Sequence, residues 1–123
     1  ISARDVIIRN NRFVDSKFEP GYLHGVIEFH TMSQTAPAGV YRRITIANNI
    51  FLGSKGNILK IGSADNIDII NNIMDHPEEE AILLYNSSNI RISGNKLTNS
   101  KTGLKIGEGC DTATIMRVDN IGF

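Results

Sequence analysis

The sequence predicts an all-β protein, a right-handed parallel β-helix (solenoid) of about five coils, and two observations support this prediction. One pattern of eight residues, in the order apolar, any, apolar, any, Asn or Gly, Asn, any, apolar, occurs four times without gaps. A second short run with apolar residues at alternate positions follows each copy. Such runs are too short for helices, and the Asn and Gly between them break any helical continuation. Two short strands in each unit of about 23 residues therefore close as coils that lie about 4.8 Å apart and pair in register.

The eight-residue pattern supplies the first strand of each coil, at 6–13, 44–51, 67–74 and 90–97. The second asparagines of these copies, which are separated by 38, 23 and 23 residues, are Asn11, Asn49, Asn72 and Asn95. Asparagine tolerates the left-handed backbone conformation, and Gly94 replaces the first Asn of the pair in one copy. We therefore predict a bend at each doublet and a structural ladder of stacked side-chain amides. A fifth copy, at 113–123 with Asn120, is degenerate.

The second strand of each coil is predicted at 26–30, 58–62, 82–86 and 103–107, and alternation sorts its side chains into two faces. The residues predicted to face the core are Ile27, Phe29, Leu59, Ile61, Leu83, Tyr85, Leu104 and Ile106. Those predicted to face outward are Glu28, Lys60, Leu84 and Lys105, with Val26, Ile58 and Ile82 in a neighbouring outward row. This makes Glu28 and Lys60 opposite charges on adjacent coils. The apolar members of the outward rows are expected to form an exposed patch, which most simply serves as a packing interface.

The repeat is irregular in its first unit, which is 15 residues longer than the next two. The excess indicates loop insertions at about 17–25 and 31–40 in a single β-helix segment that spans residues 1–123. Insertions on repeat scaffolds usually collect on one face and often form the binding surface. The candidate substrate-binding residues on or beside these loops are Tyr22, His24, Glu28, His30, Arg42 and Lys60. A purely structural interpretation stays open, in which Glu28 pairs with Lys60 and the two histidines are surface residues.

Catalytic residues cannot be assigned from the sequence. A glycosidase needs two carboxylic acids about 5–9 Å apart across the scissile bond. Glu28 is the only acid on the strand between the two insertions, and nothing determines its distance from Glu19 in the first one. The acids from Asp75 to Glu80 surround Pro77 in a turn that is expected to be solvated surface. No HxH or HExxH pattern is present, and no metal or other cofactor is predicted.

Composition excludes two classes of partner. Thirteen basic and thirteen acidic residues cancel, so the chain lacks the positive field with which proteins attract nucleic acid. The longest apolar runs are far shorter than the roughly 18 residues of a membrane span, and we predict no membrane partner. The single Cys110 cannot form an internal disulfide and is expected to be a small buried residue.

The units Val6–Phe13 and Ile44–Phe51, with the strand Gly25–Phe29 between them, resemble the pectate-lyase-like β-helix superfamily. Within it, the stretch from Ala3 to about Ser100 is most similar to the later coils of glycoside hydrolase family 110, the bacterial α-1,3-galactosidases. The resemblance implies a bacterial protein in an extracellular, periplasmic or cell-surface location that binds a glycan along the helix and cleaves a terminal galactoside with inversion. No catalytic residue is carried over, because the catalytic motif of that family matches no stretch of this chain.

Three functions follow as hypotheses. The first is the C-terminal β-helix portion of a carbohydrate-active enzyme that acts on terminal α-galactosides, whose catalytic carboxylates lie outside this chain, so that the isolated chain is inactive. The second is a non-catalytic adhesin or structural module, and the third is a segment of a calcium-dependent polysaccharide lyase. The expected partners are a glycan or polysaccharide and the remainder of a longer parent chain. Because both ends of such a fragment expose unpaired strands, self-association through the open ends is also expected.

Overall fold

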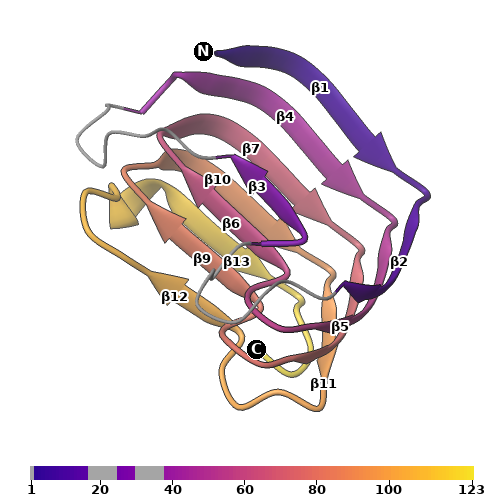
Figure 1. Cartoon of the computed structure of the whole chain (residues 1–123). Helices are drawn as coiled ribbons and strands as arrows, with labels where there is room; N and C mark the ends of the chain where they lie inside the picture. Colours follow the sequence, from indigo (N-terminus) through magenta and orange to yellow (C-terminus); the bar gives the residue numbers. More distant parts are fainter. Residues whose placement is uncertain (1, 17–24, 30–37) are drawn as a thin grey trace.

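The computed structural model describes residues 2–16, 25–29 and 38–123, which form a parallel β-helix with three walls (Figure 1). The first wall is the sheet β1 (Ala3–Arg9), β4 (Tyr41–Ala47), β7 (Ala64–Ile70), β10 (Ser88–Ser93) and β13 (Ile115–Val118). The second wall is the sheet β2 (Arg12–Ser16), β5 (Ile50–Ser54), β8 (Ile73–Pro77) and β11 (Lys96–Thr98). The third wall is the sheet β3 (Ile27–Phe29), β6 (Leu59–Gly62), β9 (Ile82–Tyr85) and β12 (Leu104–Ile106). The predicted all-β solenoid is confirmed.

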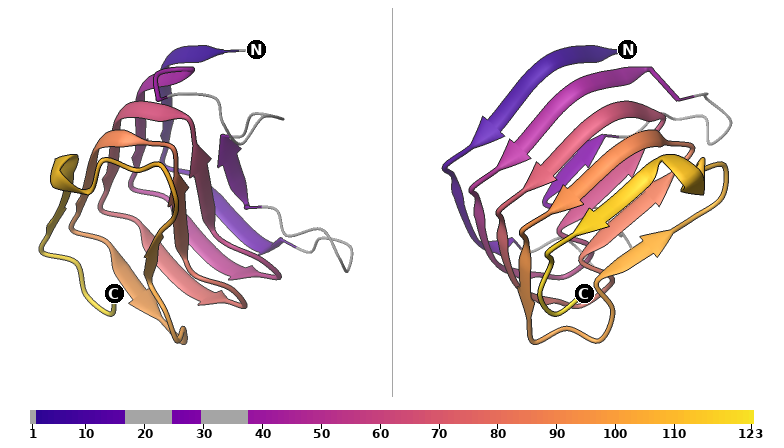
Figure 2. Two further views of the ribbon diagram at one scale, coloured as in Figure 1. Left: turned by 90° about the vertical axis from the view of Figure 1, so that its left-hand side faces the viewer. Right: turned by 180° about the vertical axis from the view of Figure 1, so that it is seen from behind.

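Each of the first four coils contributes one strand to every wall, so the walls lie around a common interior (Figure 2). All pairings between named strands are parallel, and each strand pairs with the equivalent strand of the adjacent coil. Among the described residues, the degenerate fifth repeat adds only β13 to the first wall, after the short 3₁₀ turn η1 (Thr112–Thr114). The N terminus and β13 lie at opposite ends of the stack (Figure 1).

The second wall is a finding that the two-strand interpretation of the repeat missed. Its strands begin directly after the asparagine bend, and in each of them a single large apolar residue faces the core, half-buried in β2 and buried in β5, β8 and β11. These residues form a row of Phe13, Phe51, Met74 and Leu97. Phe13 and Phe51 stack with their ring centroids 5.0 Å apart. A strand is identified in a sequence by apolar residues at alternate positions, and one such residue per strand is too few to show the alternation.

The bends lie at the first residue of each doublet, where the backbone is left-handed, with φ of 58° at Asn10, 55° at Asn48 and 67° at Gly94. The second residue of each doublet points inward and forms the asparagine ladder. In each step, the backbone N–H and the Nδ2–H of one asparagine both donate to the Oδ1 of the asparagine in the next coil. The Nδ2–Oδ1 distances along Asn11, Asn49, Asn72, Asn95 and Asn120 are 3.2, 3.1, 3.0 and 3.0 Å. The ladder thus satisfies polar groups that the bend would otherwise bury without partners.

In the third coil, the predicted assignment of third-wall side chains to the core and to the outer face was wrong, because it was shifted by one residue. Ile82 pairs with Leu59 and Leu84 pairs with Ile61, so these residues face the core and are fully buried. Leu83 and Tyr85, which were predicted to be core residues, occupy the outward row instead. A shift of one residue moves every side chain of a strand to the other face.

The predicted exposed patch of Val26, Ile58, Ile82 and Leu84 is therefore also wrong. Ile58, Ile82 and Leu84 are 0% exposed, and Val26 is half-buried against the core. The apolar side chains that do reach the surface lie on the other two walls, at Ile7, Val14, Ile50, Ile73, Met116, Val118 and, beyond the last strand, Ile121. Cys110 is a free thiol, half-buried against the core.

Candidate functional site

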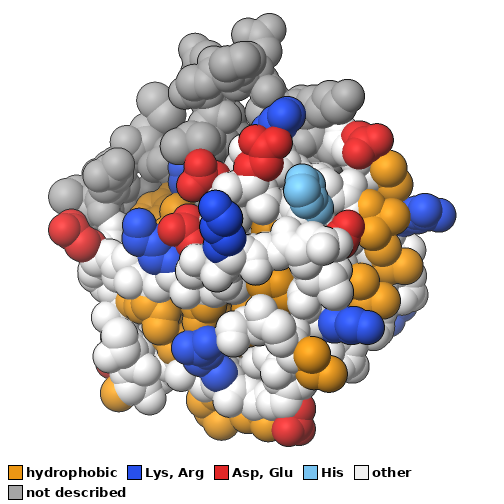
Figure 3. Space-filling view, turned by 90° about the horizontal axis from the view of Figure 1, so that it is seen from below, with side chains coloured by type: hydrophobic (Ala, Val, Ile, Leu, Met, Phe, Trp, Pro, Cys, Tyr) orange, Lys and Arg blue, Asp and Glu red, His pale blue; other side chains and the backbone are white. Residues whose placement is uncertain are grey.

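The outer face of the third wall brings together the strongest set of polar side chains. Its central row consists of Glu28, Lys60, Leu83 and Lys105, which follow one another in register from the first coil to the fourth. These residues point outward because their neighbours on both sides in each strand fill the core. Seen from below, the molecule also carries acidic and basic side chains side by side (Figure 3).

Glu28 and Lys60 form the centre of this face. Lys60 Nζ lies 3.9 Å from Glu28 Oε1, and the two side chains are only 22% and 15% exposed. The other carboxylate oxygen, Oε2, accepts a hydrogen bond of 3.2 Å from the backbone N–H of Gly25. The carboxylate is therefore held by contacts with both its own strand segment and the adjacent coil. The structure confirms the predicted pairing of the two charges.

Lys105 repeats this arrangement at the other end of the row. Its Nζ lies 3.9 Å from Glu80 Oε1, with side chains that are 61% and 24% exposed. Because this pair is open to solvent, it contributes little to stability. The face thus carries two ion pairs, one partly covered and one exposed, on either side of Leu83.

Tyr85 lies beside this row, where its ring packs over Gly62 of the preceding coil. A Cβ at Gly62 would lie 2.0 Å from Tyr85 Cζ, so the ring occupies the space that any other residue at position 62 would need. Burial of the phenol, together with smaller contributions from the charges of Glu28 and Tyr41, raises the pKa of Tyr85 to about 12. Tyr41 in turn lies 5.5 Å from Phe29, measured between ring centroids. A carboxylate, an ammonium group and a phenol from three successive coils therefore share one face.

The Tyr85 pKa predicts a pH effect that can be measured. A phenol whose pKa is higher in the folded chain than in the unfolded chain stabilises the fold below the unfolded value of about 10. This stabilisation is lost as the pH rises from about 10 to about 12. Titration of tyrosinate absorbance is expected to show one tyrosine that ionises near pH 12, and the Tyr85→Phe variant is expected to lack that step. Persistence of the step in Tyr85→Phe would assign it to another tyrosine.

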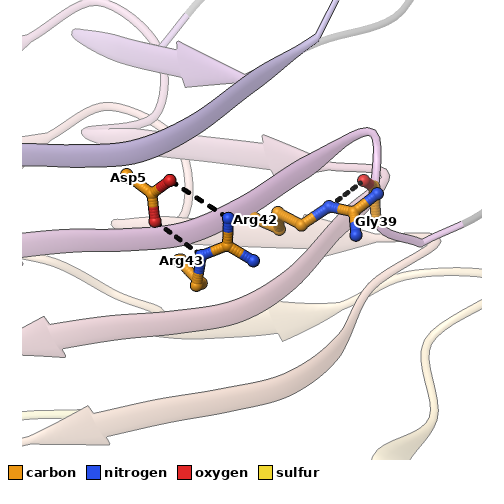
Figure 4. Close-up of polar contacts among 4 residues, drawn as sticks. All are labelled: Asp5, Gly39, Arg42 and Arg43. Carbon is orange, nitrogen blue, oxygen red and sulfur yellow. Dashed lines mark hydrogen bonds and ion pairs between the residues drawn. The ribbon is translucent and has the colours of Figure 1, made fainter.

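The other predicted site residues are Tyr22, His24, His30 and Arg42. Tyr22, His24 and His30 lie outside the described residues. Arg42 is on the first wall, is exposed, and donates from Nε to the backbone oxygen of Gly39 at 3.1 Å. Figure 4 shows its guanidinium directed to Gly39, while that of the adjacent Arg43 meets the carboxylate of Asp5.

Tyr85 was missed as a site residue because it was assigned to the core. One signal in the sequence could have identified it. The interval from the ladder asparagine to the strand is ten residues in both the second and the third coil, from Asn49 to Leu59 and from Asn72 to Ile82. Equal intervals place Ile82 opposite Leu59 and hence Tyr85 opposite Gly62, as the structure shows.

A second candidate is a hollow of about 660 Å³ between the turns that follow β8 and β11. Its lining includes His76, Glu78, Glu79, Asn99, Lys101 and Thr102. Lys55 Nζ contacts Glu78 at 2.9 Å, and both side chains are about half exposed. Just outside the hollow, hydrogen bonds from Thr98 and Asn99 lower the pKa of Asp75. Most polar groups here are thus solvated or already paired, as expected for a surface turn.

Comparison with known proteins supports the fold. Residues 1–118 match the family model described as a right handed beta helix region. The chain belongs to this family. No curated protein and no solved structure matched the chain. The family therefore establishes the right-handed β-helix but no particular activity.

No helix within 2–16, 25–29 and 38–123 is long and apolar enough to cross a membrane. In the same ranges, no three His, Cys, Asp or Glu side chains are grouped closely enough to hold a metal ion.

Proposed function

We propose that the outer face of the third wall is the glycan-binding surface of a β-helical carbohydrate-active protein. The observation that supports this proposal is the convergence of Glu28, Lys60 and Tyr85 from three successive coils. Sugar hydroxyls are both donors and acceptors, so a carboxylate, an ammonium group and a phenol can each bind one. An aromatic ring beside such polar groups also offers a flat apolar surface for the C–H face of a pyranose.

In its more specific form, the proposal is that the parent protein hydrolyses terminal α-galactosides outside the cytoplasm, in an extracellular, periplasmic or cell-surface location. Glu28 then orients the substrate. Its contacts with Lys60 and with the backbone N–H of Gly25 hold the carboxylate in a fixed position, from which it can accept a hydrogen bond from a sugar hydroxyl. Catalysis by two carboxylic acids requires a proton donor and a base or nucleophile across the bond that is cleaved. We assign those acids to coils outside this chain.

The binding surface can be mapped by NMR with the ¹⁵N-labelled chain and α-1,3-linked galactobiose as the probe. Shift changes are expected to centre on β3, β6 and β9. The variants Glu28→Gln, Lys60→Met and Tyr85→Ala are each expected to weaken binding about tenfold. This factor corresponds to the loss of one hydrogen bond to a charged group, or of one packed ring. Lys96→Met is the matched control, because Lys96 is an exposed lysine on the second wall.

Two results would contradict the proposal. Unchanged affinity in all three variants would show that the third wall is not the binding surface. Chemical-shift changes confined to the turns 76–80 and 99–102 would show that the sugar binds in the hollow instead. The assignment of catalysis to other coils is tested separately, because the chain alone is then expected to show no turnover of α-galactosides.

A non-catalytic module remains the second candidate, and one observation favours it. Ile50 and Ile73 are adjacent in register on the second wall and are 37% and 44% exposed, with Val14 52% exposed on the first coil of the same wall. Exposed apolar side chains in a cluster often mark contacts with another protein. Binding of a partner to this wall, without any glycan binding to the third wall, would favour the adhesin or structural module.

A further inference from the structure

The outer face of the first wall carries two opposite charges that the chain does not join. Asp68 in β7 and Arg91 in β10 lie opposite one another in register, and each points outward between two buried isoleucines of its own strand. Among the described residues, no ion pair or hydrogen bond connects these two side chains. Glu28 and Lys60, which have the same relation on the third wall, lie 3.9 Å apart. The charges of Asp68 and Arg91 therefore remain available to a partner.

The positions around this pair are uncharged. Two outward rows cross four coils of the first wall, and the row of the pair begins with Thr45 and ends with Met116. The neighbouring row consists of Ala47, Ile70, Ser93 and Val118. Met116 and Val118 are 57% and 40% exposed, and the other members of this neighbouring row are half-buried. The face thus offers one acid, one base and a set of small or apolar side chains.

This arrangement is self-complementary. A second copy of the chain can pack face to face on it by a two-fold axis that lies in the plane of contact and runs along the strands between β7 and β10. Such an axis reverses the order of the coils, so Asp68 of each copy faces Arg91 of the other. It also places β4 opposite β13, which covers Met116 and Val118. Sheets that pack face to face keep their strands within about 30° of each other, as this axis allows.

The other two walls do not offer the same fit. One outward row of the second wall is Arg12, Ile50, Ile73 and Lys96. The equivalent axis, between β5 and β8, would place Arg12 of one copy opposite Lys96 of the other, and like charges directly opposite each other are unfavourable. On the third wall, the lysines already lie beside acids of the same chain. Charge complementarity therefore favours the first wall as the surface for a second copy.

The size of the face determines how strong such a contact can be. Four strands, spaced about 4.8 Å apart and about 20 Å long, cover roughly 400 Å² on each copy. A total of about 800 Å² is below the usual size of a stable interface and is typical of weak, reversible complexes. The expected assembly is a dimer that dissociates on dilution.

We propose that the outer face of the first wall is a homodimer interface, in which Asp68 and Arg91 form two ion pairs between copies across a two-fold axis. The interface does not depend on glycan binding, because the glycan surface is assigned to the third wall.

Sedimentation equilibrium of the whole chain tests this interface. At concentrations up to about 1 mM, the average mass of the wild type is expected to approach that of a dimer and not to exceed it, because a two-fold contact closes. Asp68→Arg and Arg91→Asp each place like charges in both contacts and are each expected to weaken association at least about tenfold. Glu108→Arg is the control, since it makes the same change of net charge at an exposed position after β12, and it is expected to behave as wild type.

Mixing the two charge-reversal variants is the decisive measurement. An equimolar mixture of Asp68→Arg and Arg91→Asp is expected to form a heterodimer with about the wild-type affinity, because opposite charges then meet in both contacts. A mixture of Glu108→Arg with Arg91→Asp has the same net charges but keeps one like-charge contact, and it is expected to associate more weakly. Circular dichroism on each variant verifies the fold.

Three results would overturn the proposal. The first is a wild-type chain that stays monomeric over the whole concentration range. The second is an average mass that rises beyond a dimer, because another surface would then be responsible. The third is a mixture of Asp68→Arg and Arg91→Asp that associates no better than either variant alone.

Discussion

Replacement of Asn72 by alanine is expected to lower the free energy of unfolding by about 3–5 kcal/mol, a large part of the stability of a domain of this size. Asn72 is 1% exposed in the middle of the ladder. Its Oδ1 accepts from the backbone N–H and Nδ2–H of Asn49, and its Nδ2 donates to Ile46 and Asn95. Alanine leaves several of these buried groups without partners, and each unpaired group costs about 1–3 kcal/mol. Urea unfolding followed by circular dichroism measures the loss.

Asn11→Ala is the control for this prediction. Asn11 has the same place in its coil but is exposed at the end of the ladder, so water can replace the lost contacts. A loss of about 1 kcal/mol or less is expected. Equal losses in the two variants would show that the ladder is not stabilised by burial of its hydrogen bonds.

Leu84→Ala is expected to destabilise the chain by about 2–5 kcal/mol, and Leu83→Ala by less than about 1 kcal/mol. Leu84 is 0% exposed and pairs with Ile61 in the core, so its truncation leaves a cavity. Leu83 is half-buried on the outer face opposite Lys60. The two variants delete the same atoms at adjacent positions, so their difference reports only which side chain faces the core.

The order of the two losses, measured by thermal and urea unfolding, tests the register of β9. A greater loss for Leu83→Ala would restore the face assignment that the sequence alone suggested and would return Tyr85 to the core. It would thereby also remove Tyr85 from the proposed glycan surface.

Much of the candidate site could be predicted from the sequence where coils align without ambiguity. Glu28 and Lys60 lie in strands whose alternation is clear, and their pairing follows from in-register stacking. Tyr85 could not be placed in the same way, because Ile82, Leu83 and Leu84 are all apolar and hide the alternation.

By itself, the sequence determined the parallel β-helix and its asparagine ladder, because identical residues at a constant interval are brought into contact by in-register stacking. Only the tertiary structure decided the second wall and the outward position of Tyr85. The physical reason is that side chains alternate with a period of two. An error of one residue in the register of a strand therefore exchanges its buried and exposed faces, and the all-apolar run Ile82, Leu83 and Leu84 does not show which register is right.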